Sequence, residues 1–135
     1  MAKKFGAGIL LINGNNELLM LLRDNIPNIP FPNMWDIPGG QVESGENPEE
    51  TVKREMIEEM NLELGKINLF KVYESEELID SVFWKRIDLE PDKIDLKEGQ
   101  RIAYFSREEL SQLKLAFNYN LVVEEFFNFI SNCNE

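Results

Sequence analysis

Three glutamates, Glu55, Glu58 and Glu59, lie close together in a stretch of sequence that has the pattern of an α-helix. At about 100° per residue, they fall within an arc of roughly 100° on one side of that helix. Like charges spaced three or four residues apart destabilise a helix unless a cation lies between them. The chain has no His and a single Cys, so oxygen atoms are the available ligands, and they favour Mg²⁺ or Mn²⁺ over zinc. The spacing therefore predicts a divalent-cation site, and the alternative is a solvated acidic face.

The helix that carries these glutamates has recognisable ends. Asn47 is a suitable N-cap, Pro48 fits the first helical position, and Glu50 completes a capping box. Asn61 is expected to end the helix, because Asn follows Gly in its preference for the left-handed cap. The apolar residues on the arc beside the glutamates, which are expected to face the core, are Val52, Met56 and Met60.

Two glutamates at the start of the same helix have a purely structural interpretation. Glu49 precedes Lys53 by four residues, and Glu50 precedes Arg54 by four. Opposite charges at this spacing stabilise a helix, so we expect two ion pairs there. The acidic cluster that follows consists of like charges and needs another explanation.

The surrounding elements predict how this helix is positioned. Apolar residues 5–12 and 17–23 read as two strands joined across Asn13-Gly14, a hairpin signal, and prolines keep residues 24–33 irregular. Strands are also expected at 35–37, 67–73, 82–89 and 100–105, a polar loop at 91–99, a short helix from Ser106, and a final helix at 119–131. The core side of that final helix is predicted to carry Leu121, Val122, Phe126, Phe129 and Ile130. This order predicts an α+β chain, an α/β/α sandwich without strict βαβ alternation.

Composition bounds the function further. The chain has 135 residues, enough for one domain with its own core, and a net charge of −11. That charge excludes a nucleic-acid polymer or an anionic membrane surface as partner, but it permits a small phosphorylated ligand whose binding a cation mediates. Without His there is no Ser-His-Asp chemistry, and Cys133 alone forms no internal disulfide. The apolar run 5–12 is too short for a signal peptide or a membrane span, so we expect a cytoplasmic protein.

The residues around the acidic cluster match a known pattern. The stretch 40–62 begins with Gly40 and has Glu46 after five intervening residues. After seven more residues it has the run Arg-Glu-Met-Ile-Glu-Glu-Met-Asn-Leu at 54–62. This pattern resembles the Nudix box of the Nudix hydrolases, the MutT-like proteins. Residues 35–40, which end in Gly39 and Gly40, resemble the usual lead-in to that box. One position differs, since Asn61 stands where the family has Gly. The resemblance implies a Nudix-type α/β/α sandwich with a mixed β-sheet, formed by a single domain over residues 1–135 with its box at 40–62.

The resemblance also implies roles for individual residues. The metal-binding groups would be Glu55, Glu58, Glu59 and the carbonyl of Gly40, with Mg²⁺ as the cofactor and Mn²⁺ as its substitute. Arg54 would hold the glutamates in place, and Glu46 would pair with Arg54. Family members often add a carboxylate from outside the box, and Glu98 is the best candidate here, with an ordinary exposed acid as the alternative. The general base is left open between Glu58 and Glu98.

Signals for the substrate are weaker. Arg23 can reach a phosphate or simply be a solvated residue at a strand end. Phe31 and Trp35 can stack on a base, although core or lid packing is the favoured interpretation. Asn118 stands where some MutT-like enzymes place a base-reading Asn, and a plain helix N-cap is the favoured alternative.

Three functions follow from the resemblance. The first is a Mg²⁺-dependent Nudix pyrophosphohydrolase that cleaves a diphosphate linkage in a nucleoside triphosphate or another nucleoside diphosphate derivative. The second is a non-catalytic Nudix-fold module for ligand binding or regulation, which would be expected to lack some of the residues Arg54, Glu55, Glu58 and Glu59. The third is a prenyl diphosphate isomerase, which would want a Cys near the pocket, whereas Cys133 lies in the tail. The expected partner is a small phosphorylated substrate, and a homodimer is left open.

Overall fold

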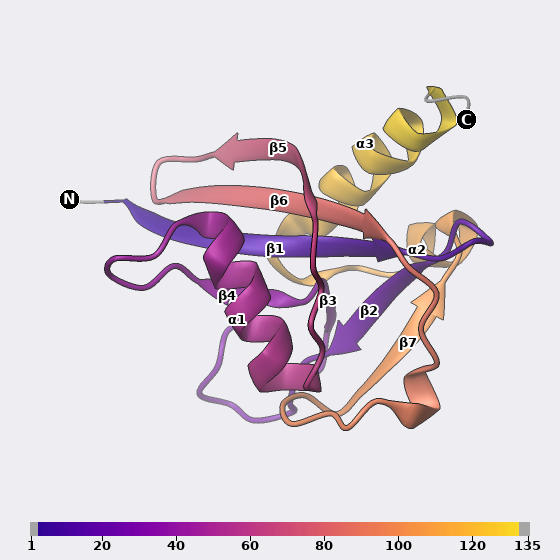
Figure 1. The fold of residues 1–135 in the computed structure, drawn as a ribbon, viewed down its shortest axis with the longest axis horizontal. Helices are drawn as coiled ribbons and strands as arrows, with labels where there is room; N and C mark the ends of the chain where they lie inside the picture. Colours follow the sequence, from indigo (N-terminus) through magenta and orange to yellow (C-terminus); the bar gives the residue numbers. More distant parts are fainter. Residues whose placement is uncertain (1–2, 133–135) are drawn as a thin grey trace.

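A seven-stranded mixed sheet forms the centre of the molecule (Figure 1). The computed structural model describes residues 3–132, so Cys133 lies outside the described residues. The strand order is β3-β2-β1-β6-β5, with β4 paired to β1 and β7 paired to β2. The strands are β1 (Lys4–Ile12), β2 (Leu18–Leu22), β3 (Trp35–Asp36), β4 (Gly39–Gln41), β5 (Asn68–Glu74), β6 (Leu78–Arg86) and β7 (Arg101–Phe105).

Helices cover both faces of this sheet. They are α1 (Pro48–Met60), α2 (Arg107–Ser111) and α3 (Tyr119–Asn132), with 3₁₀ turns η1 (Pro91–Lys93) and η2 (Ala116–Asn118). In Figure 1, α1 lies on the near side of the sheet, and α2 and α3 lie on the far side. The predicted α/β/α sandwich with a mixed sheet is confirmed. None of the helices in the described chain is long and apolar enough to cross a membrane.

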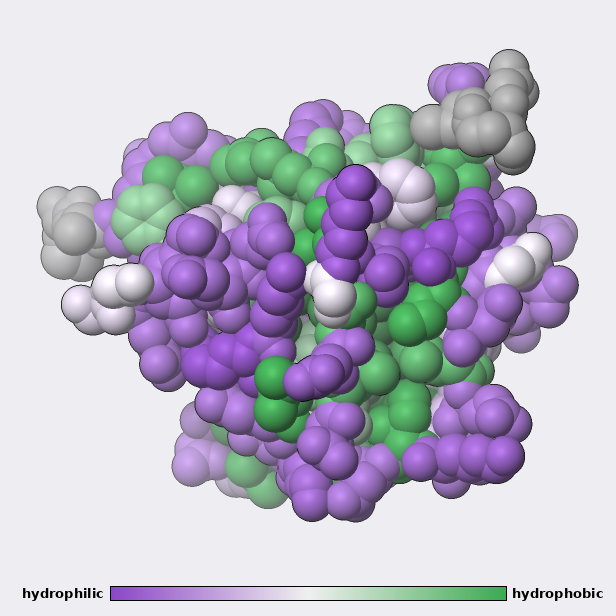
Figure 2. All heavy atoms as spheres, in the orientation of Figure 1, coloured by the Kyte–Doolittle hydropathy of each residue, from purple (hydrophilic) through white to green (hydrophobic). Residues whose placement is uncertain are grey.

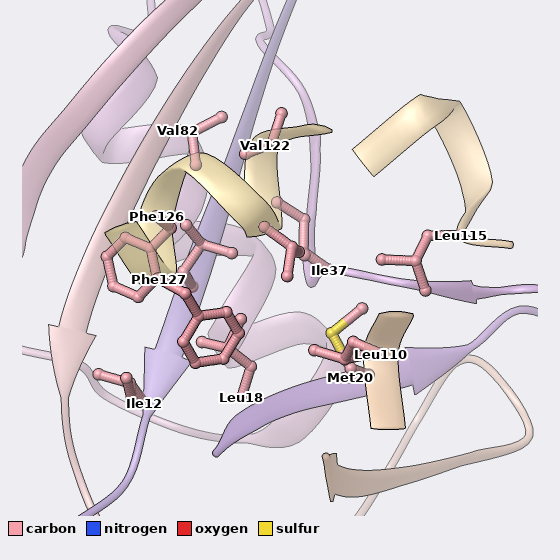
Figure 3. Packing of buried hydrophobic residues seen from close by; sticks show 12 residues of the cluster. Ile12, Leu18, Met20, Ile37, Val82, Leu110, Leu115, Val122, Phe126 and Phe127 are labelled. Carbon is pink, nitrogen blue, oxygen red and sulfur yellow. The ribbon is translucent and has the colours of Figure 1, made fainter. Parts of the chain in front are cut away.

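The central strand β1 is buried on both faces, which explains its continuous apolar sequence. Ile9 and Leu11 pack on the α1 side, together with the apolar side chains of α1. Leu10 and Ile12 pack on the opposite side, where α3 contributes Phe126 and its neighbours (Figure 3). The residues of α1 predicted to face the core, which are Val52, Met56 and Met60, are all buried.

The strand β6 begins four residues earlier than the sequence pattern predicts. It pairs in parallel with the whole of β1, from Lys4 opposite Leu78 to Ile12 opposite Arg86. Polar residues Asp80 and Ser81 interrupt the apolar pattern at its start, yet both are buried. The pairing with β1, which is distant in sequence, therefore decides where β6 begins.

The turn between β1 and β2 forms a hairpin, as predicted, but with a longer loop. Asn16 has the left-handed φ of 58°, and the Asn13 side chain accepts hydrogen bonds from the backbone N–H groups of Asn15 and Glu17. The turn is therefore built around an Asn side chain that caps its own loop.

The core side of α3 is rotated relative to the prediction. Val122 and Phe126 are buried as expected, but Leu121 is 56% exposed, so that assignment is wrong. Phe129 is at the margin, with its ring centroid 5.3 Å from that of Phe70. The buried stripe of α3 includes Val123 and Phe127 instead. Which side of α3 is buried depends on the strands against which it packs, and the sequence of the helix alone does not give their position.

Candidate active site

The two ends of α1 fix the direction of its side chains. The Asn47 side chain accepts from the Glu50 N–H at 2.8 Å, and the Glu50 carboxylate accepts from the Asn47 N–H at 2.9 Å. Asn61 ends the helix in the left-handed conformation, with φ of 53° and ψ of 41°. Both predicted caps are confirmed. They hold the helix in register, so that Glu55 and Glu59, one turn apart, face the same cavity.

Of the two ion pairs predicted at the start of α1, one is formed. Lys53 lies 3.1 Å from Glu49. The pair predicted between Glu50 and Arg54 is wrong, because the Glu50 carboxylate is used in the capping box. Arg54 contacts other carboxylates instead.

Arg54 connects the loop before α1 to the acidic cluster. Its Nε and Nη2 atoms donate to the two carboxylate oxygens of Glu46 at 2.7 and 3.0 Å. Its Nη1 atom donates to Glu55 and to Glu58, each at 3.2 Å. Hydrogen bonds from Arg54, above all, lower the pKa of Glu46 to about 2. The pairing of Glu46 with Arg54 is therefore present, and the same guanidinium orients two glutamates of the cluster.

A cavity of about 300 Å³ lies beside this cluster and is lined by Gly40, Glu55, Glu59 and Glu98. Glu59 is the most buried of these acids, with 6% of its surface exposed. Burial, the hydrogen bond and charge of Glu55, and the charge of Glu98 raise the pKa of Glu59 to about 9. Ionising Glu59 in this position therefore costs free energy unless a positive charge compensates it.

Gly40 leaves room for the Glu55 carboxylate. A Cβ atom at this position would lie 2.2 Å from Glu55 Oε2, far closer than any van der Waals contact. Any side chain at residue 40 would therefore displace Glu55. This close approach gives a physical reason for the first glycine of the box.

The loop before β7 places Glu98 against α1. The backbone N–H of Lys97 donates to the Glu59 carbonyl at 2.7 Å, which connects the loop to the end of the helix. The Gln100 side chain donates to the Arg23 carbonyl and to Asn33 Oδ1, both at 2.8 Å. The backbone on both sides of Glu98 is therefore anchored, and the exposed Glu98 side chain lines the cavity.

Glu58 lies apart from this group. Its side chain is 55% exposed, its Oε1 accepts from Arg54, and it does not line the cavity. The structure thus brings together Gly40, Glu55, Glu59 and Glu98 and leaves Glu58 exposed to solvent. Figure 2 shows that the surface over α1 is largely hydrophilic.

The cavity is suited to a hard cation by the chemistry of its donors. Within residues 3–132, no three or more Asp, Glu, His or Cys side chains already have the spacing of a metal site. Arg54 holds Glu55 and Glu58 by hydrogen bonds, and burial beside other acids raises the pKa of Glu59. The available donors are carboxylate and carbonyl oxygens, which Mg²⁺ and Mn²⁺ prefer. A cation bound among these acids would relieve their mutual repulsion, so the residues of the cavity fit a divalent metal ion.

A second cavity, of about 400 Å³, adjoins the first. The two share Arg23, Asp36 and residues 37–40 as a wall. The second cavity is lined further by Asp80, Phe117 and Tyr119. Burial raises the pKa of Asp36 to about 6, although Arg23 opposes the rise. The first cavity, which is lined by acids, and the second cavity, which is partly aromatic, thus lie side by side.

Arg23 lies at the junction of the two cavities. Its Nη1 atom donates to Asp36 at 3.1 Å, and its Nε atom donates to the Pro30 carbonyl at 2.9 Å. Its guanidinium carbon lies 5.1 Å from the centroid of the Phe117 ring. Arg23 is therefore an oriented side chain at the cavity and not a freely solvated strand end.

The other residues predicted to bind substrate, Phe31 and Asn118, line neither cavity. Phe31 is exposed in a left-handed conformation with φ of 49°, and its ring centroid is 4.6 Å from that of Phe117. Asn118 is also exposed and lines neither cavity, whereas its neighbours Phe117 and Tyr119 do. Trp35 packs edge-on against Phe105, as core packing predicts.

Sequence reasoning missed Asp36, Asp80 and Tyr119 as cavity residues. A signal was present for the two acids, since each directly follows an apolar or aromatic strand residue, Asp36 after Trp35 and Asp80 after Ile79. A buried carboxylate in such a place needs a hydrogen-bond partner or a ligand. Tyr119 gave no such signal, because a Tyr at the start of a helix is equally typical of packing.

Comparison with known proteins places this site in a family. The chain is 37% identical over 54 residues to a Bacillus subtilis (strain 168) protein named "Putative 8-oxo-dGTP diphosphatase". The aligned segment covers 40% of this chain and 32% of that protein, so the match spans about a third of the relative's length.

Two solved structures share the fold. The MutT protein from Methanosarcina mazei Go1 aligns with a TM-score of 0.76 and 24% identity, over 99% of each chain. The NUDIX domain of Shewanella oneidensis NrtR, crystallised with ADP ribose, aligns with a TM-score of 0.78 and 17% identity, over 96% of this chain and 90% of that one. At these identities the two structures show the fold alone. The family model described as the NUDIX domain matches residues 2–126, and the chain therefore belongs to the Nudix family.

Proposed function

We propose that the chain is a Mg²⁺-dependent pyrophosphohydrolase that cleaves a diphosphate linkage in a nucleoside triphosphate or another nucleoside diphosphate derivative. The observation that carries the proposal is the wall that the two cavities share, which includes Arg23 and Asp36. A phosphate chain bound at the acidic cavity leaves its organic group in the neighbouring cavity. The volume of about 400 Å³ is within the range of roughly 300–1,000 Å³ that is typical of ligand pockets.

The residues of the acidic cavity have distinct tasks in this reaction. Glu55, Glu59 and Glu98, with the Gly40 carbonyl, are the groups that would hold Mg²⁺ or Mn²⁺. When bound, the cation neutralises charge on the phosphoryl oxygens and lowers the pKa of water. Arg54 is a positioning residue, since it fixes Glu55 through its hydrogen bond and is itself fixed by Glu46.

Glu98 is the general base that the geometry favours. Both side chains are exposed, but Glu98 lines the acidic cavity, whereas Glu58 does not and its Oε1 accepts a hydrogen bond from Arg54. A base must lie within hydrogen-bond reach of the proton that it removes. In this proposal a carboxylate oxygen of Glu98 takes a proton from water in the cavity, and Glu58 is a hydrogen-bond partner of Arg54.

The relatives support a nucleotide as the substrate class. The Bacillus protein bears the name of a diphosphatase for a nucleoside triphosphate, and the Shewanella domain binds ADP ribose, a nucleoside diphosphate derivative. The name of the Bacillus protein indicates a nucleoside triphosphate and the ligand of the Shewanella domain is a nucleoside diphosphate derivative, so both substrate classes belong to the proposal.

A substrate panel tests the proposal directly. Purified protein is incubated with nucleoside triphosphates, ADP-ribose and other nucleoside diphosphate derivatives, with Mg²⁺, with Mn²⁺ or with a chelator. Inorganic phosphate and pyrophosphate are measured separately. We expect metal-dependent cleavage and, for a triphosphate, release of pyrophosphate together with the monophosphate. Glu59→Gln should lower kcat by at least ~10²-fold, a loss of roughly 3 kcal/mol in transition-state stabilisation. Metal-dependent binding of these ligands without cleavage by the wild type would favour the non-catalytic module instead.

A further inference from the structure

Asp80 is a buried carboxylate at the second cavity, away from the acidic cluster. It lies in β6, lines the cavity, and is 8% exposed. The hydroxyl of Tyr119 donates to its Oδ2 atom at 2.7 Å. Within residues 3–132, no hydrogen bond reaches its Oδ1 atom, although this oxygen is not sealed from the cavity. Asp80 therefore has spare capacity to accept hydrogen bonds.

The backbone beside Asp80 leaves that oxygen uncovered. Gly6 of β1 is the direct neighbour of Asp80 in the parallel register and lines the same cavity. A Cβ atom on Gly6 would lie 3.2 Å from Asp80 Oδ1. Because Gly6 has no side chain, a ligand can approach Asp80 over the strand.

The other acid of this cavity is already satisfied. Asp36 Oδ1 accepts from the Ile37 N–H at 2.8 Å, and Oδ2 accepts from Arg23 at 3.1 Å. Phe117, which has a left-handed φ of 53° and is 39% exposed, adds an aromatic wall. A bulky residue in this backbone conformation is uncommon and is often found at ligand sites. The cavity thus combines one available carboxylate with an aromatic surface suited to a flat ring.

We propose that Asp80, held by Tyr119, is a specificity-determining residue that accepts hydrogen bonds from the N–H groups of a nucleobase. This inference rests on the proposed function. A carboxylate accepts two hydrogen bonds side by side, and the base edge with two adjacent donors is the N1–H and N2–H₂ edge of guanine. The cavity therefore selects a base with adjacent donors and discriminates against one that lacks the exocyclic donor.

Desolvation explains why the discrimination should be strong. A buried carboxylate that has lost water is costly unless donors replace the water. Burial raises the pKa of Asp80, and the Tyr119 hydroxyl offsets part of that rise. A base with two N–H donors completes the hydrogen bonding of the carboxylate, whereas a base with fewer donors leaves an acceptor unpaired. A site built to hydrogen-bond a substrate N–H rejects the analogue that lacks it.

The test compares dGTP with dITP, which differ only in the exocyclic amino group, in wild type and in Asp80→Asn. A hydrogen bond to a charged group changes kcat/KM by roughly 10- to 100-fold. We expect the wild type to prefer dGTP, and Asp80→Asn to lose that preference mainly through a higher KM for dGTP. Cleavage of a base-free pentose 5′-triphosphate should be unchanged. Tyr119→Phe should shift the preference in the same direction by less, and it supplies the measurement if Asp80→Asn does not fold.

Tyr104→Phe is the matched control, since the Tyr104 hydroxyl bonds to the backbone of Ile87 and Leu89 outside the cavity. It should leave the ratio of dGTP to dITP unchanged. An unaltered ratio in Asp80→Asn would overturn the inference, as would an equal loss on the base-free substrate, which would indicate a structural role. Calorimetric binding of dGMP and dIMP tests the same preference without turnover. A protein that binds dGMP selectively through Asp80 but cleaves neither nucleoside triphosphates nor nucleoside diphosphate derivatives would refute the proposed function and support this inference.

Discussion

Gly39 and Gly40 are adjacent, yet a methyl group added to each should have different consequences. At Gly40, the added Cβ would lie 2.2 Å from Glu55 Oε2, 2.4 Å from its Cδ and 2.9 Å from its Cγ. Ordinary contacts begin at 3.4 Å, so the Glu55 carboxylate must move by more than about 1 Å. A displacement of that size in a catalytic group costs on the order of 10²-fold in rate. We therefore expect Gly40→Ala to lower kcat about 10²-fold.

At Gly39 the obstacle is backbone. The added Cβ would lie 2.2 Å from the Ala7 carbonyl oxygen and 2.7 Å from the Gly8 Cα, and φ is +152°. These atoms belong to the buried strand β1 and have no free rotation. Overpacking and backbone strain each cost ~1–3 kcal/mol. We therefore expect Gly39→Ala to reduce the free energy of unfolding by roughly 3 kcal/mol or more, whereas Gly40→Ala should change it by less than about 1 kcal/mol.

Two assays separate these effects. Urea unfolding, with the slope m checked for constancy, measures the stability of both variants, and Mg²⁺-dependent pyrophosphate release measures activity. Gly40→Ala should fold normally and be nearly inactive. Native activity in Gly40→Ala would refute the role assigned to the position of Glu55. An equal loss of stability in the two variants would show that the Glu55 side chain cannot move aside as the geometry requires.

Three further predictions concern the acids of the site and the end of α1. The pKa of Asp36 is raised from 3.8 to about 6, so the folded state binds this proton more tightly. Stability from neutral Asp36 is present below pH ~4 and lost as pH rises through ~6. Relative to Asp36→Asn, the wild type should lose roughly 2.5 kcal/mol of unfolding free energy between pH 4 and 7. Parallel curves from denaturant melts would contradict this. Glu98→Gln should reduce kcat more than Glu58→Gln, by about 10-fold or more; the reverse order in steady-state assays would reassign the base to Glu58. Asn61→Gly should be neutral or stabilising by a few tenths of a kcal/mol in thermal melts, because Gly adopts the left-handed cap without steric cost; a loss above about 1 kcal/mol would indicate a side-chain contact at Asn61.

The parts of the site that were predictable from sequence are those fixed by local interactions. The caps at Asn47 and Asn61 depend on residues within one helical turn, and both were predicted. The pairing of Glu46 with Arg54 was implied by the resemblance to the Nudix box, and the structure contains it. The exposure of Glu58 was not predictable, because a helical wheel gives an arc of carboxylates but not the edge of that arc that faces the sheet.

The parts that were missed depend on contacts between distant segments. Asp36 and Asp80 come from β3 and β6, and Tyr119 comes from the start of α3. They meet because β6 pairs in parallel with β1 along its full length, a pairing that no local pattern encodes. The stripe of α3 was misplaced for the same reason, since Leu121 is apolar but faces solvent.

The electrostatics of the site point to a ligand more directly than any one residue does. Burial, above all, raises the pKa of Glu59 to about 9 and that of Asp36 to about 6, so each acid destabilises the folded state when it is ionised at neutral pH. An isosteric amide would remove that cost at either position, and stability alone therefore does not explain the acids. Both acids line the cavity next to Arg23, where a cation would offset the charge of the carboxylates and the guanidinium would attract a phosphate. The destabilising acids are thus located where the binding of a metal and an anionic substrate would make them favourable.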